Sequence, residues 1–205
     1  MSTPQGWYCE SVKKDLLQRY WHSRRFRKVT GLISPVKGKV LDIGCADGLF
    51  SKQILDKSKA GELIGIDIEK SSIDWAKIHW KKNKKMIFKT ADAHNLKFKD
   101  GTFDAVVALE VLEHVKEPAK VLQEVKRVLK KDGYGIFLVP TDNLLFRIIW
   151  FLWLKFYPRG YVWRETHIQS YRNNYLPMIC KEAGFIIDTK IDFIFGMLQI
   201  VKVKK

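Results

Sequence analysis

The residues of this chain that could do chemistry are glycines, carboxylates and histidines placed just after apolar runs. The first set is a glycine-rich turn of the form Asp42-x-Gly44-x-Ala46-x-Gly48. Gly44 lets the chain turn sharply because it has no Cβ, and Asp47 can cap a following helix. A strand, a tight turn and a helix start in so few residues indicate a cradle for a nucleotide-type cofactor. The charge of Asp42 at its mouth suits a cationic cofactor better than a diphosphate.

A second set of carboxylates follows the next apolar runs. Asp67 ends Ile64-Gly65-Ile66-Asp67-Ile68, and Asp92 lies in Ala91-Asp92-Ala93. A carboxylate at the tip of a second parallel strand can accept both hydroxyls of an adenosine ribose and repels a 2′-phosphate, which disfavours NADP. NAD stays open, although the usual G-x-G-x-x-G spacing is missing.

The third set is Glu110-Val111-Leu112-Glu113-His114. If this segment is helical, Glu110, Glu113 and His114 share one face and could hold a divalent metal, with His167 as a further ligand. Two alternatives stay open: His114 acts as a general base or substrate hydrogen-bond partner, or these residues only brace the loop.

Alternating strand and helix patterns must position these residues, which predicts a parallel sheet covered on both faces. Strands are expected at 39–43, 63–68, 86–90, 103–108, 134–139, 185–192 and 195–203, and helices at 49–57, 71–82 and 119–129. The last two strands alternate as an antiparallel pair would.

Together, the four motifs from Val40 onward resemble the class I S-adenosylmethionine (SAM) dependent methyltransferases, in particular the small-molecule enzymes of the ubiquinone and menaquinone type. The resemblance implies an α/β, Rossmann-like, doubly wound seven-stranded sheet with an antiparallel last strand, and SAM as cofactor. It implies His114 as the catalytic residue. It implies a cofactor site of Asp42, Gly44, Cys45, Ala46, Gly48, Asp67, Ile68, Asp92, Ala93 and Glu110.

The motif departs from the family at one position and leaves one role open. Many relatives have glycine where Ala46 stands, and the added methyl group is expected to alter SAM affinity without abolishing binding. The E-x-x-E-H pattern also resembles small-RNA terminal 2′-O-methyltransferases, in which these positions can hold a metal. The metal ligands of this chain are therefore not assigned.

Two segments flank this core. Residues 1–35 are expected to form an N-terminal helical cap over the cofactor mouth. Within this cap, two roles stay open for Tyr20, Trp21 and His22: they lie near the acceptor, or they only cover the edge of the sheet. Residues 36–205 form the methyltransferase domain, with an apolar lid insertion at about 142–168. Its run 144–157 is too short and too charged to span a bilayer, so a lid, an interfacial helix that touches a membrane, and a dimer interface are the alternatives.

Composition supports one globular domain and leaves more than one class of binding partner open. The chain of 205 residues has a net charge of +15, three scattered cysteines and no signal-peptide pattern, which predicts a cytoplasmic protein, peripheral to a membrane if 144–157 touches one. The main hypothesis is methyl transfer from SAM to a small hydrophobic acceptor such as a quinone precursor, isoprenoid or lipid. An RNA 2′-O-methyltransferase and a non-catalytic SAM-binding regulator are the alternatives. The oligomeric state is not predicted.

Overall fold

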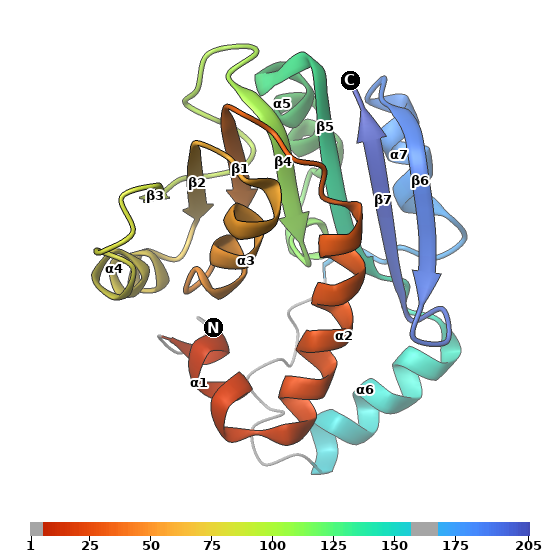
Figure 1. Ribbon diagram of the computed structural model, residues 1–205. Coiled ribbons are helices and arrows are strands. Elements are labelled where there is room, and N and C mark those ends of the chain that lie inside the picture. The colour runs from red at the N-terminus through yellow and green to blue at the C-terminus, as the bar shows by residue number, and fades with distance from the viewer. Residues whose placement is uncertain (1–5, 157–167) are drawn as a thin grey trace.

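A seven-stranded mixed sheet organises the chain in the computed structural model, which describes residues 6–156 and 168–205. The strand order is β3-β2-β1-β4-β5-β7-β6 (Figure 1). The strands are β1 (Lys39–Ile43), β2 (Glu62–Asp67), β3 (Met86–Thr90), β4 (Phe103–Leu109), β5 (Leu129–Pro140), β6 (Ile186–Phe193) and β7 (Leu198–Lys204). β1 to β5 pair in parallel, whereas β7 is antiparallel to both neighbours. This confirms the expected doubly wound fold.

Helices cover both faces of the sheet. They are α1 (Trp7–Lys14), α2 (Leu16–Leu32), α3 (Leu49–Ser58), α4 (Lys70–His79), α5 (Pro118–Val128), α6 (Leu144–Phe156), α7 (Tyr175–Glu182) and the short 3₁₀ helix η1 (Leu112–His114). Side chains of α2, α3 and α4 share one buried apolar cluster, and those of α5 and α7 share the other. The central strands β1 and β4 are therefore buried on both sides, as their apolar runs predict.

Helix α5 follows its sequence pattern closely, but its end differs from the prediction. Val121, Leu122 and Val125 are fully buried, and each contributes about 1.5–3 kcal/mol by leaving water. The helix ends at Val128, and Leu129 is already extended and paired with Phe103 of β4. The strand thus begins five residues before the expected Tyr134, because pairing with β4 overrides the local helical pattern.

The carboxyl ends of the parallel strands point toward α1, α2 and α6 (Figure 1). Within the range 1–35, α1 and α2 contact each other, and α2 also contacts α3. The prediction of N-terminal helices is confirmed. That 1–35 and 36–205 are separate units stays a prediction.

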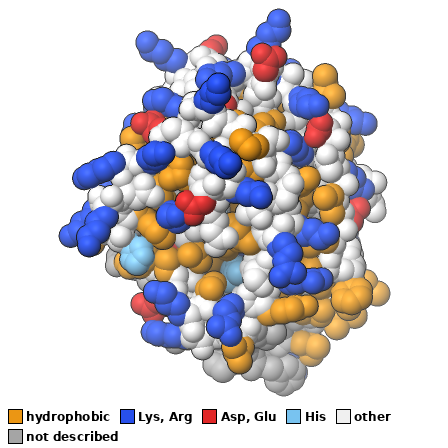
Figure 2. Space-filling view, viewed as in Figure 1, with side chains coloured by type: hydrophobic (Ala, Val, Ile, Leu, Met, Phe, Trp, Pro, Cys, Tyr) orange, Lys and Arg blue, Asp and Glu red, His pale blue; other side chains and the backbone are white. Residues whose placement is uncertain are grey.

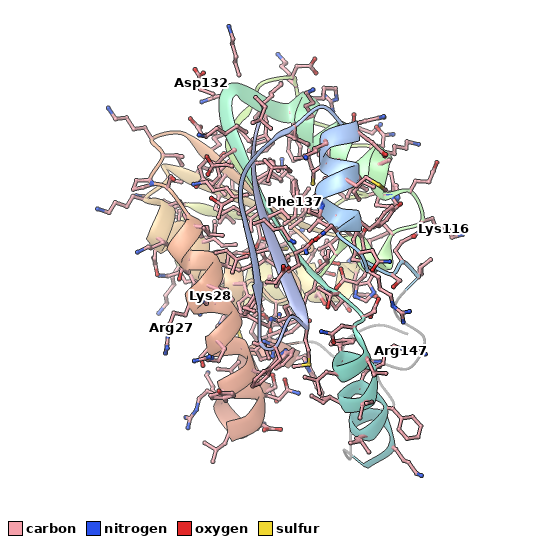
Figure 3. The ribbon with its side chains drawn as sticks, turned by 90° about the vertical axis from the view of Figure 1, so that its right-hand side faces the viewer. Arg27, Lys28, Lys116, Asp132, Phe137 and Arg147 are labelled. Carbon is pink, nitrogen blue, oxygen red and sulfur yellow. The ribbon has the colours of Figure 1, made fainter. Side chains whose placement is uncertain are left out.

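Helix α6 is the most exposed apolar element in the described residues. Leu144 is 71% exposed and Phe151 60%, while Arg147 and Lys155 add positive charge. Figure 2 shows apolar side chains gathered at the lower edge of a face otherwise rich in Lys and Arg, and Figure 3 shows the side chains of α6 projecting outward. None of the described helices is long and apolar enough to cross a bilayer. Residues 157–167 of the expected insertion, including His167, lie outside the described residues.

Candidate functional site

The turn after β1 has the geometry for which its glycines are needed. Gly44 and Gly48 have left-handed backbones, with φ of 71° and 77°. A Cβ on Gly44 would collide with the side chain of Val111, and one on Gly48 would lie 2.6 Å from the ring of Phe88. Both positions therefore need glycine, and the turn can come close to a bound cofactor. Ala46 also has a positive φ, of 46°, which is strained for alanine.

Asp67 ties this turn to the end of β2. Its Oδ2 accepts a hydrogen bond from Ala46 N at 2.9 Å, and its Oδ1 accepts one from Glu69 N at 2.9 Å. Burial raises the pKa of the carboxyl group, and the two backbone donors oppose that shift. The expected ribose-binding carboxylate is thus fixed beside the glycine turn by backbone hydrogen bonds.

Two other predicted residues have side chains that point into the fold. Asp42 is buried and accepts a 2.6 Å hydrogen bond from Ser51 Oγ, and burial raises its pKa to about 7. Cys45 is also buried, with its sulfur next to Gly65 of β2. These side chains hold β1 against α3 and β2, so only their backbone atoms lie along the turn.

The next predicted cofactor-binding residues, Asp92 and Ala93, follow the end of β3. Asp92 is exposed and accepts hydrogen bonds from the backbone N–H of His94, at 2.9 Å, and interacts with the His94 ring at 2.7 Å. The backbone hydrogen bond is the largest cause that lowers the pKa of Asp92, so this group stays ionised. Ala93 is buried, whereas Ile68, at the end of β2, is open to solvent.

Helix α1 is bonded to the glycine turn through Asp47. Cys9 N donates to Asp47 Oδ2 at 2.7 Å, and Leu49 N donates to Oδ1 at 3.1 Å. The expected helix cap is confirmed as a side-chain contact, although the N-cap position itself is Gly48. Trp80 Nε1 donates to the Asp47 carbonyl at 2.8 Å. Helix α1 is therefore held beside the glycine turn.

An ion pair that the sequence reasoning missed joins the cap to β4. Arg25 on α2 is 6% exposed and forms a 2.9 Å ion pair with Glu110, which directly follows β4. Glu110 has a left-handed backbone, with φ of 55°. The sequence did contain a pattern that could have revealed Arg25, because His22 and Val29 lie three and four residues from it on the same helical face.

The residues of α2 that are expected near the acceptor lie in different environments. Tyr20 is exposed, whereas His22 is buried against Tyr8 and Phe50. Neither ring nitrogen of His22 has a hydrogen-bond partner, and burial lowers its pKa to about 2, so the ring is neutral. His22 therefore behaves as a core side chain in the closed cap.

The expected shared face of Glu110, Glu113 and His114 does not form. Only Leu112–His114 is helical, and Glu110 lies outside this 3₁₀ turn with its side chain on Arg25. Glu113 is 1% exposed, its Oε2 has no partner, and burial raises its pKa well above the usual range. Across 6–156 and 168–205 no three His, Cys, Asp or Glu side chains gather as metal ligands. His114 is half-buried at the end of η1.

Comparison with known proteins agrees with this geometry. Residues 41–137 match the family model described as "Methyltransferase domain". The chain is 38% identical over 118 residues to the ubiquinone biosynthesis O-methyltransferase of Pelagibacter ubique, a match that covers 57% of this chain and 47% of that protein. It is 27% identical over 188 residues to the enzyme of the same name from Aromatoleum aromaticum, covering 83% of this chain and 78% of that one.

The comparison with solved structures shows the same fold. A SAM-dependent methyltransferase from Aquifex aeolicus superposes with a TM-score of 0.65 at 17% identity, covering 88% of this chain and 87% of that one. The chain spans about half the length of the Pelagibacter relative. The glycine turn, the carboxylate held beside it, the strand order and the match over residues 41–137 together support a class I SAM-dependent methyltransferase.

Proposed function

We propose that this chain transfers a methyl group from SAM to an oxygen of a small, hydrophobic acceptor. The observation that carries the proposal is the hydrogen bond from Ala46 N to Asp67, which couples the glycine turn to a carboxylate with free lone pairs. The named relatives, both ubiquinone biosynthesis O-methyltransferases, support an oxygen acceptor. When bound, SAM supplies a methyl group that is already electrophilic because it is attached to a sulfonium.

In this proposal, residues at the ends of β1, β2 and β3 bind different parts of SAM. Asp67 would accept the ribose hydroxyls, and the exposed Ile68 would help to hold the adenosine part. Asp92 and Ala93 lie at the adenine edge. The backbone of the turn, over Asp42, Gly44, Cys45, Ala46 and Gly48, lies along the amino-acid part.

Arg25 and Glu110 supply the charged groups that bind the amino-acid part of SAM in this proposal. The two groups neutralise each other in this structure at 2.9 Å. An amino acid has an ammonium and a carboxylate of matching sign, so Glu110 can bind the first and Arg25 the second when the pair separates. The desolvated position of Arg25 makes this exchange favourable, because no charge is left without a partner.

His114 is the proposed general base. It follows β4 by a few residues, at the edge of the sheet where the acceptor must meet the methyl group. A hydroxyl acceptor gains from a base with a pKa near neutrality, and imidazole provides one. Alignment of acceptor and methyl group by the closed cap supplies the rest of the rate enhancement.

The test is a transfer assay with SAM labelled in its methyl group. Catechols carrying alkyl chains of increasing length are compared with a short RNA that ends in a free 2′-hydroxyl. We expect kcat/KM to rise with chain length, and activity to survive EDTA. Transfer to RNA alone, dependent on a divalent metal, would instead establish the RNA alternative, and SAM binding with no transfer to any acceptor would establish the regulator.

Membrane contact through α6 is a second part of the proposal. The exposed apolar residues of α6 lie beside the β6–β7 turn, because Asn143 Nδ2 donates to the carbonyl of Phe195 at 3.2 Å. Phe195 is 87% exposed, and Arg147 and Lys155 supply charge for an anionic surface.

A vesicle assay tests this contact. We expect the protein to sediment with vesicles that contain anionic phospholipid, and Phe151→Ser to weaken binding at least fivefold. Ile78→Ser, which removes an exposed apolar side chain from α4, is the matched control. Equal binding of both variants would contradict a specific role for α6.

A further inference from the structure

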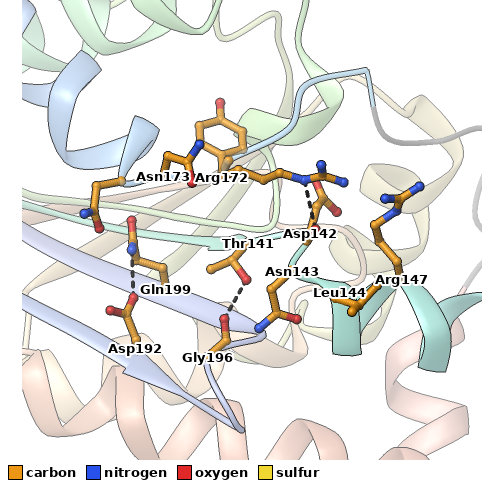
Figure 4. Close-up of a pocket in the computed structure, with 12 residues that line it drawn as sticks. Thr141, Asp142, Asn143, Leu144, Arg147, Arg172, Asn173, Asp192, Gly196 and Gln199 are labelled. Carbon is orange, nitrogen blue, oxygen red and sulfur yellow. Dashed lines mark hydrogen bonds between the residues drawn. The ribbon is translucent and has the colours of Figure 1, made fainter.

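A cavity of about 390 Å³ lies beyond the carboxyl end of β5, at the start of α6 and beside the β6–β7 turn (Figure 4). Its size falls within the range of small-molecule sites. Thr141 and Asp142 come from the end of β5, Asn174 from the start of α7, and Gly196 from the turn. Three segments distant in sequence therefore converge on one space, and none of these residues belongs to the SAM site described above.

One wall of the cavity has a buried acceptor without a donor. Gln199 is 3% exposed, and its Nε2 donates to Asp192 Oδ1 at 2.7 Å. Its Oε1 has no hydrogen-bond partner. Buried polar atoms are almost always satisfied, so this oxygen indicates a ligand with an O–H or N–H donor.

The other side of the cavity carries two arginines, Arg147 and Arg172. Figure 4 shows the guanidinium groups of Arg147 and Arg172 on the same side of the space, opposite Gln199. Arg172 Nε donates to the carbonyl of Asp142 at 3.0 Å, which fixes its position. Neither arginine forms an ion pair within the described ranges, whereas Asp192 is already paired with Lys190 at 3.1 Å. Paired guanidinium groups match the oxygens of a carboxylate or phosphate.

Three residues that line the cavity have strained backbone conformations. Asp142, Asn173 and Asn174 have φ of 50°, 53° and 61°. Left-handed conformations of residues other than glycine cost free energy and cluster at ligand sites. Asn and Asp tolerate this conformation best, which agrees with their use here.

The cavity adjoins the proposed reaction edge. Tyr171, which lines it, is buried and donates from its hydroxyl to the carbonyl of Leu112 in η1 at 2.9 Å. His114 belongs to the same short helix. Glu110 N donates to Leu138 of β5 at 2.8 Å, two residues before the strand ends at the cavity. A molecule bound in the cavity therefore lies one side-chain layer from η1.

We propose that this cavity binds the polar head of the methyl acceptor, and that this head is an organic anion with a hydroxyl group. Arg147 and Arg172 bind its carboxylate or phosphate, and Gln199 Oε1 accepts from its hydroxyl. This inference rests on the proposed methyl transfer and names the class of its substrate. An apolar tail on the same acceptor would extend along α6.

The test measures binding of three probes by calorimetry, with S-adenosylhomocysteine at saturation. The probes are 3-hydroxybenzoate, phenyl phosphate and the neutral 3-hydroxybenzyl alcohol. We expect one of the anions to bind at least tenfold more tightly than the alcohol, and the tighter anion identifies the group as carboxylate or phosphate. Arg172→Gln and Arg147→Gln should each weaken anion binding at least fivefold.

Arg27→Gln is the matched control, because Arg27 is exposed on α2 and far from the cavity (Figure 3). Gln199→Met should weaken 3-hydroxybenzoate but not benzoate. Equal binding of alcohol and anions, or no effect of either arginine, would overturn the inference while cofactor binding persists. Failure of S-adenosylhomocysteine to bind would instead refute the proposed function itself, and anion binding in that case would overturn the assignment to an acceptor.

Discussion

Replacing Asp67 by alanine should separate cofactor binding from folding. The carboxylate has about four lone-pair positions, and the structure shows two of them occupied by Ala46 N and Glu69 N. The remaining two match the two hydroxyls of a ribose. Hydrogen bonds to a charged group contribute about 1.5–3 kcal/mol each, so the loss is about 3–6 kcal/mol. We expect the Kd for SAM to rise by a factor of about 150 to 25,000.

The assay is isothermal titration with SAM and with S-adenosylhomocysteine. Ala46 N and Glu69 N lose their acceptor in the variant, which should lower the free energy of unfolding by about 1–2 kcal/mol. Thermal denaturation therefore accompanies the titration and establishes that the variant is folded. Asp56→Ala is the matched control, since Asp56 is an exposed carboxylate of α3 paired with Lys52. Binding by Asp67→Ala within threefold of the wild type would refute the assignment of the ribose site.

Three further substitutions test the site from other directions. Ala46→Gly removes a left-handed alanine, so urea denaturation should show about 0.5–1 kcal/mol more stability, and an unchanged or lower value would contradict the strain. Asp42 has a folded pKa of about 7, above its unfolded value, so its protonated form stabilises the fold and stability falls as pH rises between about 4 and 7. Asp42→Asn should reduce the change in unfolding free energy over this pH range by about 3–4 kcal/mol, whereas an identical curve would show that Asp42 does not titrate there. His114→Gln should lower kcat by about 10²- to 10⁴-fold with little change in SAM affinity, and full activity would exclude it as the base.

Features set by local pattern could be predicted from the sequence. β1 and β3 begin and end at the expected residues, because short apolar runs bounded by turns specify buried strands. The glycine turn was equally predictable, since only glycine fits the backbone at Gly44 and Gly48. The antiparallel end of the sheet followed from alternating residues and from the family resemblance.

Features set by tertiary contact could not. The ion pair of Arg25 with Glu110 joins elements 85 residues apart, and no local pattern relates the two. Glu113 enters the core because the segment forms one 3₁₀ turn, where a helix was assumed. The cavity of Arg147, Arg172 and Gln199 depends on three distant segments, and no local pattern in the sequence brings these segments together.

The bond between Cys9 and Asp47 joins the N-terminal helix α1 to the glycine turn. If SAM binds at this turn as proposed, we expect entry and release of the cofactor to be coupled to the opening of that bond. Linkage of binding free energies then acts in both directions: a ligand that contacts both the turn and α1 stabilises the docked helix, and a change that loosens α1 weakens binding of that ligand by the same free energy. We therefore expect cofactor affinity to depend on a helix that contains none of the proposed reacting groups.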